Sequence, residues 1–70
     1  MFNHNELKGR MIAKYGSQLE FAKAFGVSEN TLSMKMNNKV RFTTDDIIKI
    51  IGMLEIPINE IGLYFFTEMV

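Results

Sequence analysis

The side chains that could support catalysis or metal binding are few and widely spaced in this sequence. It contains no cysteine, its one histidine is His4, and no second metal ligand stands three or four residues after it. The adjacent carboxylates Asp45 and Asp46 begin a predicted helix, where the helix dipole favours negative charge, and this explains them better than acid–base catalysis. Neither a nucleophile with a neighbouring base nor a phosphate-binding glycine loop is present. We therefore expect no enzyme, no metal and no cofactor.

A run of hydrogen-bonding side chains from Ser28 to Thr31 is the remaining group with chemical potential. Such side chains can read the edges of DNA bases in the major groove. The same residue types also occur as ordinary caps and first-turn residues of helices. The two interpretations can be distinguished only by the predicted helices on which these residues lie.

Start and stop signals predict an all-α fold, a compact bundle of about five short helices. The first helix has Asn5 as its cap and ends at Gly16, where a glycine suits a left-handed C-terminal residue. A capping-box sequence from Ser17 to Glu20 begins the second helix, and Gly26 ends it.

The third predicted helix is capped by Ser28 and runs through about Met36, before a polar turn over residues 37–39. Thr43 with Asp46, or Thr44 alone, caps the fourth helix, and Pro57 begins a short fifth one. The apolar residues expected inside recur at helical spacing: Leu7, Met11, Tyr15, Phe21, Ala22, Phe25, Leu32, Met36, Ile47, Ile50, Ile51, Leu54, Ile58 and Ile61.

Only residues 26–28 separate the second and third predicted helices, which is the length of a tight helix-turn-helix corner. Ala22 lies where the two backbones would approach, and Gly26 occupies the turn position that requires a positive φ. Val27 and Leu32 supply apolar side chains beneath the corner. This arrangement favours a recognition surface over a simple cap for the polar run that follows.

The length and the charge distribution of the chain indicate its domain organisation and its possible partners. The chain has 70 residues without an internal repeat or linker, so residues 1–70 are predicted to form a single domain. The net charge is zero, yet residues 1–42 carry +4 and residues 43–70 carry −4, so a basic face remains possible. No signal peptide or membrane-spanning stretch is recognised, and we expect a cytoplasmic protein.

The run QLEFAKAFGVSENTLS, residues 18–33, resembles the helix-turn-helix of the phage repressor and Cro family, and residues 37–39 resemble that family's Asn-Gly-Lys turn. The resemblance covers roughly residues 6–62. The ending IGLYFFTE is similar to small Cro-like proteins of phages and prophages of Gram-positive bacteria. The resemblance implies a lambda-repressor-like DNA-binding domain with its helix-turn-helix at about residues 17–37.

In that family the third helix lies in the major groove of double-stranded DNA. The resemblance implies five base-reading candidates, Glu29, Asn30, Thr31, Ser33 and Met34. It implies phosphate contacts from Gln18, Ser28, Lys35, Asn37, Lys39 and Arg41. Three features depart from the pattern: Glu29 brings negative charge to the groove, Lys35 occupies a usually apolar position while Met36 takes the buried role, and the third helix has no arginine.

The C-terminal tail, residues 63–70, contains the apolar run Leu63, Tyr64, Phe65 and Phe66. In an extended conformation alternate side chains point in opposite directions, so one pair would stay outside and form a dimer or partner interface. The alternatives are a tail that folds back over the first and fourth helices, or one pair in the core and the other at an interface.

Three functions are compatible with these observations. The leading hypothesis is a Cro-like transcriptional regulator that represses by occupying a pseudo-palindromic operator as a homodimer. The alternative is a small phage antirepressor or modulator that binds a repressor protein through the same fold, which suits the neutral charge and the acidic Glu29. The third is an assembly or adaptor domain without a nucleic-acid role.

Overall fold

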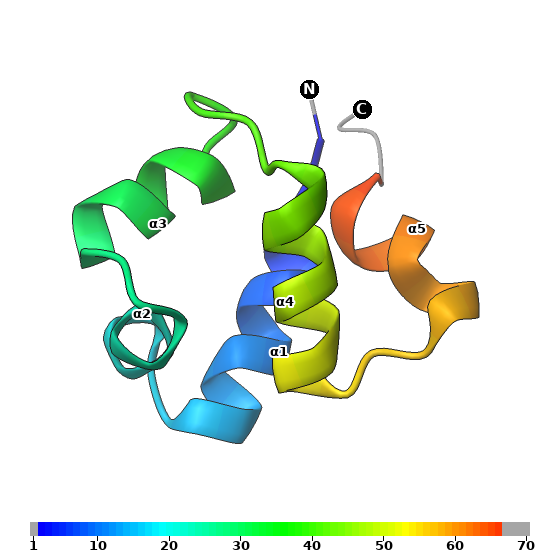
Figure 1. Ribbon diagram of the computed structural model, residues 1–70, viewed down its shortest axis with the longest axis horizontal. Helices are drawn as coiled ribbons and strands as arrows, with labels where there is room; N and C mark the ends of the chain where they lie inside the picture. The colour runs from blue at the N-terminus through cyan, green and yellow to red at the C-terminus, as the bar shows by residue number, and fades with distance from the viewer. Residues whose placement is uncertain (1, 67–70) are drawn as a thin grey trace.

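The computed structural model describes residues 2–66, which fold into five α-helices and one 3-10 turn. Helix α4 lies in front of α1 at the centre, α2 and α3 lie on one side of this pair, and η1 and α5 lie on the other (Figure 1). The elements in chain order are α1 (Asn5–Tyr15), α2 (Gln18–Phe25), α3 (Glu29–Met36), α4 (Thr44–Leu54), the 3-10 turn η1 (Ile58–Glu60) and α5 (Ile61–Phe65).

The predicted helix starts are formed by side-chain caps. The hydroxyls of Ser17, Ser28 and Thr43 each accept a hydrogen bond from the backbone N–H three residues later, at 3.0, 3.1 and 3.0 Å. The Asp46 carboxylate accepts from the Thr43 N–H in return at 3.0 Å, which completes the predicted capping box. At Ser17 the cap is formed, but the Glu20 carboxylate lies 3.5 Å from a lysine of its own helix. These caps satisfy amide groups that the helix itself leaves unpaired.

The N-terminal segment differs from the prediction. Asn5 is the first helical residue rather than the cap, because its N–H donates to the side-chain oxygen of Asn3 at 2.8 Å. His4 is buried, with its Nδ1 3.1 Å from the carbonyl oxygen of Met36 and its ring edge-on to Phe42. The histidine therefore ties the start of α1 to the end of α3.

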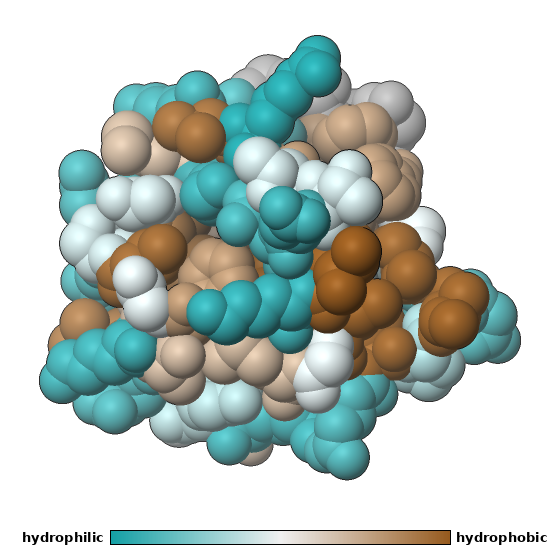
Figure 2. Space-filling model, in the orientation of Figure 1, coloured by the Kyte–Doolittle hydropathy of each residue, from teal (hydrophilic) through white to brown (hydrophobic). Residues whose placement is uncertain are grey.

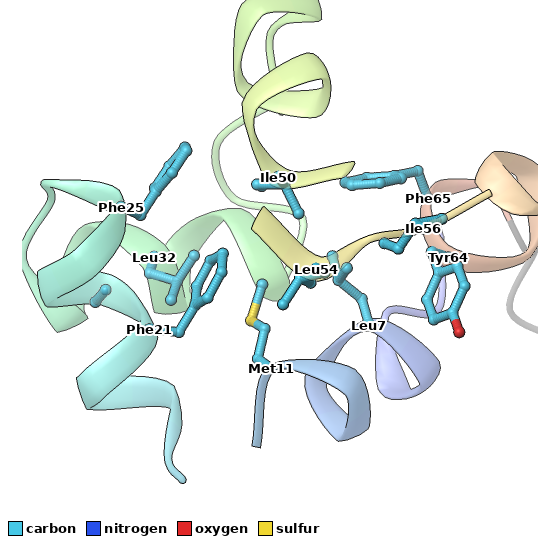
Figure 3. Packing of buried hydrophobic residues seen from close by; sticks show 11 residues of the cluster. Leu7, Met11, Phe21, Phe25, Leu32, Ile50, Leu54, Ile56, Tyr64 and Phe65 are labelled. Atoms are coloured by element: carbon cyan, nitrogen blue, oxygen red, sulfur yellow. The ribbon is translucent and has the colours of Figure 1, made fainter. Parts of the chain in front are cut away.

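The core receives fully buried side chains from all five helices (Figure 3). Its largest members are Leu7, Met11, Phe21, Leu32, Ile50, Leu54 and Phe65. Burying a side chain of this size stabilises the fold by about 1.5–3 kcal/mol. Ala22 is fully buried, as the corner requires, and Ile47 and Ile51 pack against the cluster from its edge. The predicted inward faces of α1, α2 and α4 are confirmed.

The chain after α4 differs most from the prediction. Ile58 was expected inside but is 82% exposed, whereas Ile56 is buried. The reason lies at the end of α4, where Glu55 adopts a left-handed conformation and the Ile56 N–H donates to the carbonyl oxygen of Ile51 at 3.0 Å. This turn points Ile56 into the core, and the 3-10 turn that follows Pro57 directs Ile58 to solvent.

The tail is helical through Phe65 instead of extended, so its side chains do not alternate. Tyr64 and Phe65 are both buried in the core, while Leu63 and Phe66 are exposed. The pairs expected from an extended tail, Leu63 with Phe65 and Tyr64 with Phe66, are therefore wrong. Residues 67–70 of the predicted tail lie outside the described residues.

Two glycine substitutions test the helix assignments with opposite expected signs. Gly26 has φ 96° at the α2–α3 corner, and a Cβ there would meet nothing within 4 Å. Gly26→Ala should therefore lower the free energy of unfolding by about 1 kcal/mol through conformational strain alone. Gly52 lies within α4 with equally open surroundings, so Gly52→Ala should raise it by about 0.5–1 kcal/mol. Urea unfolding of both variants measures the difference, and equal effects would contradict the corner geometry.

Candidate functional site

The corner between α2 and α3 has the geometry of a helix-turn-helix. Gly26 is left-handed, with φ 96° and ψ 22°, and its N–H donates to the carbonyl oxygen of Ala22 at 2.9 Å. The Val27 N–H donates to the same oxygen at 3.1 Å. Leu32 is fully buried beneath the turn, and Ser28 then begins α3. The local signals therefore place α3 where its outer face is free to meet a partner.

The five base-reading candidates are not equally available on that face. Glu29 and Asn30 are exposed, and neither side chain has a hydrogen bond or ion pair within residues 2–66. The Thr31 hydroxyl accepts a hydrogen bond from the Ser28 hydroxyl at 3.0 Å, and the Ser33 hydroxyl accepts one from the Asn37 amide at 3.3 Å. The free polar groups on the outer face are therefore Glu29 and Asn30, while Met34 is half-buried.

A polar groove runs between α1, the start of α2 and α3. Lys8 and Ile12 line it from α1, Gln18 from α2, and Asn30 and Ser33 from α3. A second hollow, lined partly by the same Lys8, Gln18 and Ser33, continues it toward Asn37 and His4. Lys8 was not among the residues predicted from the sequence, although it directly follows the buried Leu7 and so flanks the inward face of α1.

The loop between α3 and α4 presents the remaining phosphate-contact candidates. Lys39 and Arg41 are exposed on it, and neither forms an ion pair with another described residue. Asn38 has φ 63°, as the predicted turn required. Its amide donates to the carbonyl oxygen of Phe2 at 2.7 Å and its side-chain oxygen accepts from the Phe2 N–H at 3.2 Å. The loop is thus held against the N-terminal segment with its two cations outward.

Lys35 does not face solvent, which corrects the expectation of a phosphate contact there. The residue is 9% exposed, and its Nζ lies 2.6 Å from Oδ2 of Asp46 and 3.3 Å from the carbonyl oxygen of Arg41. The Phe42 ring packs beside the ammonium, 6.0 Å from it. Because its charge is neutralised inside the protein, Lys35 joins α3 to α4. Met36, expected to take the buried role, is only half-buried.

The Asp46 carboxylate is held ionised by the same contacts. Its partial burial would by itself raise the pKa of this carboxyl group. The hydrogen bond from Lys35 and that from the Thr43 N–H outweigh this effect and lower the pKa below its ordinary value of 3.8. The carboxylate thus serves as both the cap of α4 and the partner of Lys35.

Most of the lysine and arginine side chains form ion pairs or hydrogen bonds within the protein. Lys14 pairs with Glu55, Lys35 pairs with Asp46, and Lys23 lies near Glu20. The Arg10 guanidinium donates to the carbonyl oxygens of Leu54 and Glu55, at the end of α4, at 3.0 Å each. The Lys49 ammonium donates to the Phe25 carbonyl oxygen at 2.7 Å. Such contacts stabilise the negative ends of helix dipoles. The cations left available by the described contacts are Lys8, Lys39 and Arg41.

The interface predicted in the tail is reduced to two side chains among the described residues. Tyr64 and Phe65 belong to the core, where the Phe65 ring meets Phe42 edge-on at 5.3 Å. Leu63 and Phe66 remain on the surface, and Phe66 meets the Phe2 ring edge-on at 5.5 Å. Within residues 2–66, no helix is long and apolar enough to cross a membrane, and no three metal-ligating side chains gather.

Comparison with known proteins identifies relatives of this chain. A family model described as "Protein of unknown function (DUF739)" matches residues 1–68. The chain is also similar to the modulator of repression (MOR) of the temperate bacteriophage TP901-1 from Lactococcus lactis, whose structure was determined in solution. The two share 40% sequence identity with a TM-score of 0.82, over 93% of this chain and 88% of the other. No curated protein sequence matches the chain.

The Lys35–Asp46 ion pair predicts a specific loss of stability in acid. Because the pKa of Asp46 is lowered on folding, the unfolded chain binds more protons in this range, and the free energy of unfolding must fall as pH decreases through the folded-state pKa. The loss should begin below about pH 5. Asp46→Asn should reduce this acid dependence, measured by urea unfolding between about pH 6 and pH 2. Asp45→Asn, at an exposed neighbour without an ion pair, is the matched control; an unchanged slope in Asp46→Asn would contradict the assignment.

Proposed function

The chain belongs to the DUF739 family and shares its fold with a phage modulator of repression, and on this basis we propose that it modulates phage repression by binding a repressor protein. The observation that carries the proposal is the 40% identity to MOR over nearly the whole of both chains. That relative is named for acting on repression, which matches the antirepressor alternative better than operator occupancy.

The use of charge in the structure supports a protein partner. A protein that binds DNA through many phosphate contacts needs a set of available cations. Here Lys8, Lys39 and Arg41 are available, whereas the other five cations have contacts within the protein. Glu29 adds an unpaired negative charge at the start of α3. A surface of this kind suits a protein interface, where charge density is low and apolar contacts contribute more.

Operator binding is a second candidate, favoured by one specific observation. The Asn30 amide stands exposed and unpaired on α3, beside the groove that holds Lys8 and next to a loop that presents Lys39 and Arg41. An amide in that place can make a paired contact with adenine. In this candidate function the chain binds a pseudo-palindromic operator as a homodimer, and specificity comes from Asn30 with help from DNA shape.

Salt dependence separates the two functions. We expect the purified chain to bind the repressor encoded in the same phage genome, with an affinity that falls far less between about 50 and 200 mM salt than the affinity of a DNA complex would. Isothermal titration calorimetry measures this. The proposal would be contradicted if the chain did not bind the repressor but did bind operator DNA, with an affinity that fell steeply over the same range of salt.

If the chain does contact DNA, two substitutions should affect DNA binding in different ways. Asn30→Ala should cost about 1–3 kcal/mol on the preferred site and relax the preference at one base pair. Lys39→Ala should weaken binding to all sequences about equally and reduce the salt slope by about one. Competition binding with variant operators measures both. An equal loss of discrimination in the two variants would remove Asn30 from base reading.

A further inference from the structure

A surface separate from α3 has the features of a protein-binding patch. Figure 2 shows a strongly hydrophobic area over one edge of α4 and over the adjoining η1 and α5. Ile48 on α4 is 59% exposed and Ile58 on η1 is 82% exposed. The half-buried Ile51 lies one turn after Ile48, and the half-buried Ile61 lies one turn after Ile58. We name these four side chains the isoleucine patch.

The two edges of α4 explain why this patch is uncovered. On one edge, Asp46 contacts α3 through Lys35, and Lys49 contacts the end of α2. Ile48 lies on the outer side of α4 and is 59% exposed, while Ile51, one turn later, packs partly against the core. Figure 1 shows η1 and α5 on the side of α4 that faces away from α2 and α3. The packing that fixes α3 therefore leaves an apolar edge of α4 without a partner in the described chain.

The charges around the isoleucine patch are acidic. Asp45 lies one turn before Ile48 on α4, and Glu60 directly precedes Ile61. Neither carboxylate pairs with a cation in residues 2–66. Lys49, the nearest cation in sequence, donates to the Phe25 carbonyl oxygen at 2.7 Å and stacks on the Phe25 ring, so it points toward α2. The rim of the patch thus carries negative charge without a local counter-charge.

We infer that the isoleucine patch is the surface that binds the repressor, and that its complement is an apolar repressor surface flanked by lysine or arginine side chains. This inference rests on the proposed function and assigns the surface through which it operates. The isoleucines supply the apolar contact, while Asp45 and Glu60 orient the partner by charge complementarity.

A second copy of this chain is a poorer fit to the same surface. A two-fold dimer uses the same patch on both partners, so the acidic rims would face each other. Asp45 and Glu60 of one copy would then meet like charges of the other, which disfavours association. A partner with cations at the matching positions removes this repulsion and adds an attractive contact.

Exposed side chains allow the inference to be tested without disturbing the core. Ile48→Ser and Ile58→Ser should each weaken repressor binding about tenfold or more, because each removes an apolar side chain from the contact. Leu19→Ser, at an exposed apolar residue of α2, is the matched control and should bind as the unmodified chain does. Calorimetric titration of the full chain with the repressor gives the affinities, and circular dichroism checks that each variant remains helical.

Charge reversal provides an independent measurement. Asp45→Lys combined with Glu60→Lys should weaken repressor binding, and the loss should shrink as salt rises, because screening reduces the new repulsion. Glu6→Lys combined with Glu20→Lys, at two exposed carboxylates of α1 and α2, is the charge-matched control and should have little effect. If the unmodified chain binds but the isoleucine and charge variants bind equally well, the patch assignment is wrong while the proposed function stands. If the unmodified chain does not bind, both fail.

Sedimentation of the chain alone tests whether a second copy of this chain, rather than the repressor, covers the isoleucine patch. We expect a monomer at concentrations of about 10–100 μM, well above those of a specific complex. A dimer that Ile58→Ser dissociates would instead make the patch a contact between copies of this chain, and would overturn its assignment to the repressor.

Discussion

The ion pair between Lys35 and Asp46 fixes the position of α3 relative to the rest of the protein. One carboxylate oxygen accepts both the Lys35 ammonium at 2.6 Å and the Thr43 N–H at 3.0 Å, so the end of α3 is bonded to the start of α4. Phe42 and His4 pack beside this contact. Breaking a largely buried pair by removing one partner leaves an unpaired charge, which is more costly than loss of an exposed pair. The outer face of α3 therefore depends on an interaction made on its inner face.

The same use of charge limits which partners the surface can bind. Arg10 and Lys49 stabilise the ends of α4 and α2, and Lys14 pairs with Glu55 across the fold. Of the seven cations in the predicted basic half, residues 1–42, four have contacts within the fold. The other three, Lys8, Lys39 and Arg41, remain available near α3. The molecule thus combines a helix-turn-helix corner with an outer face of α3 on which the acidic Glu29 is unpaired. The relation to a modulator of repression agrees with this combination.

Local signals allowed most of the fold to be predicted, and the parts that failed depend on distant contacts. Gly26, Ser28 and the Thr43–Asp46 pair act within a few residues, so their caps and turns follow from sequence. Lys35 could not be placed because its partner lies on the next helix. The apolar run after Gly62 has no periodicity of its own, and its helical part packs against α1 with Tyr64 and Phe65 buried. On α3, the residue types are evident from the sequence, but only the structure separates the unpaired Asn30 from the Thr31 and Ser33 hydroxyls, which accept hydrogen bonds from the cap residues of the helix.

Amide chemical-shift mapping of the labelled chain, titrated first with the repressor and then with operator DNA, would decide between a protein partner and a DNA partner. The account predicts saturable shifts with the repressor that concentrate on the exposed edge of α4 and on η1 and α5, and only weak, salt-sensitive shifts with DNA. Saturable shifts on the first turn of α3 with DNA, together with no response to the repressor, would contradict it.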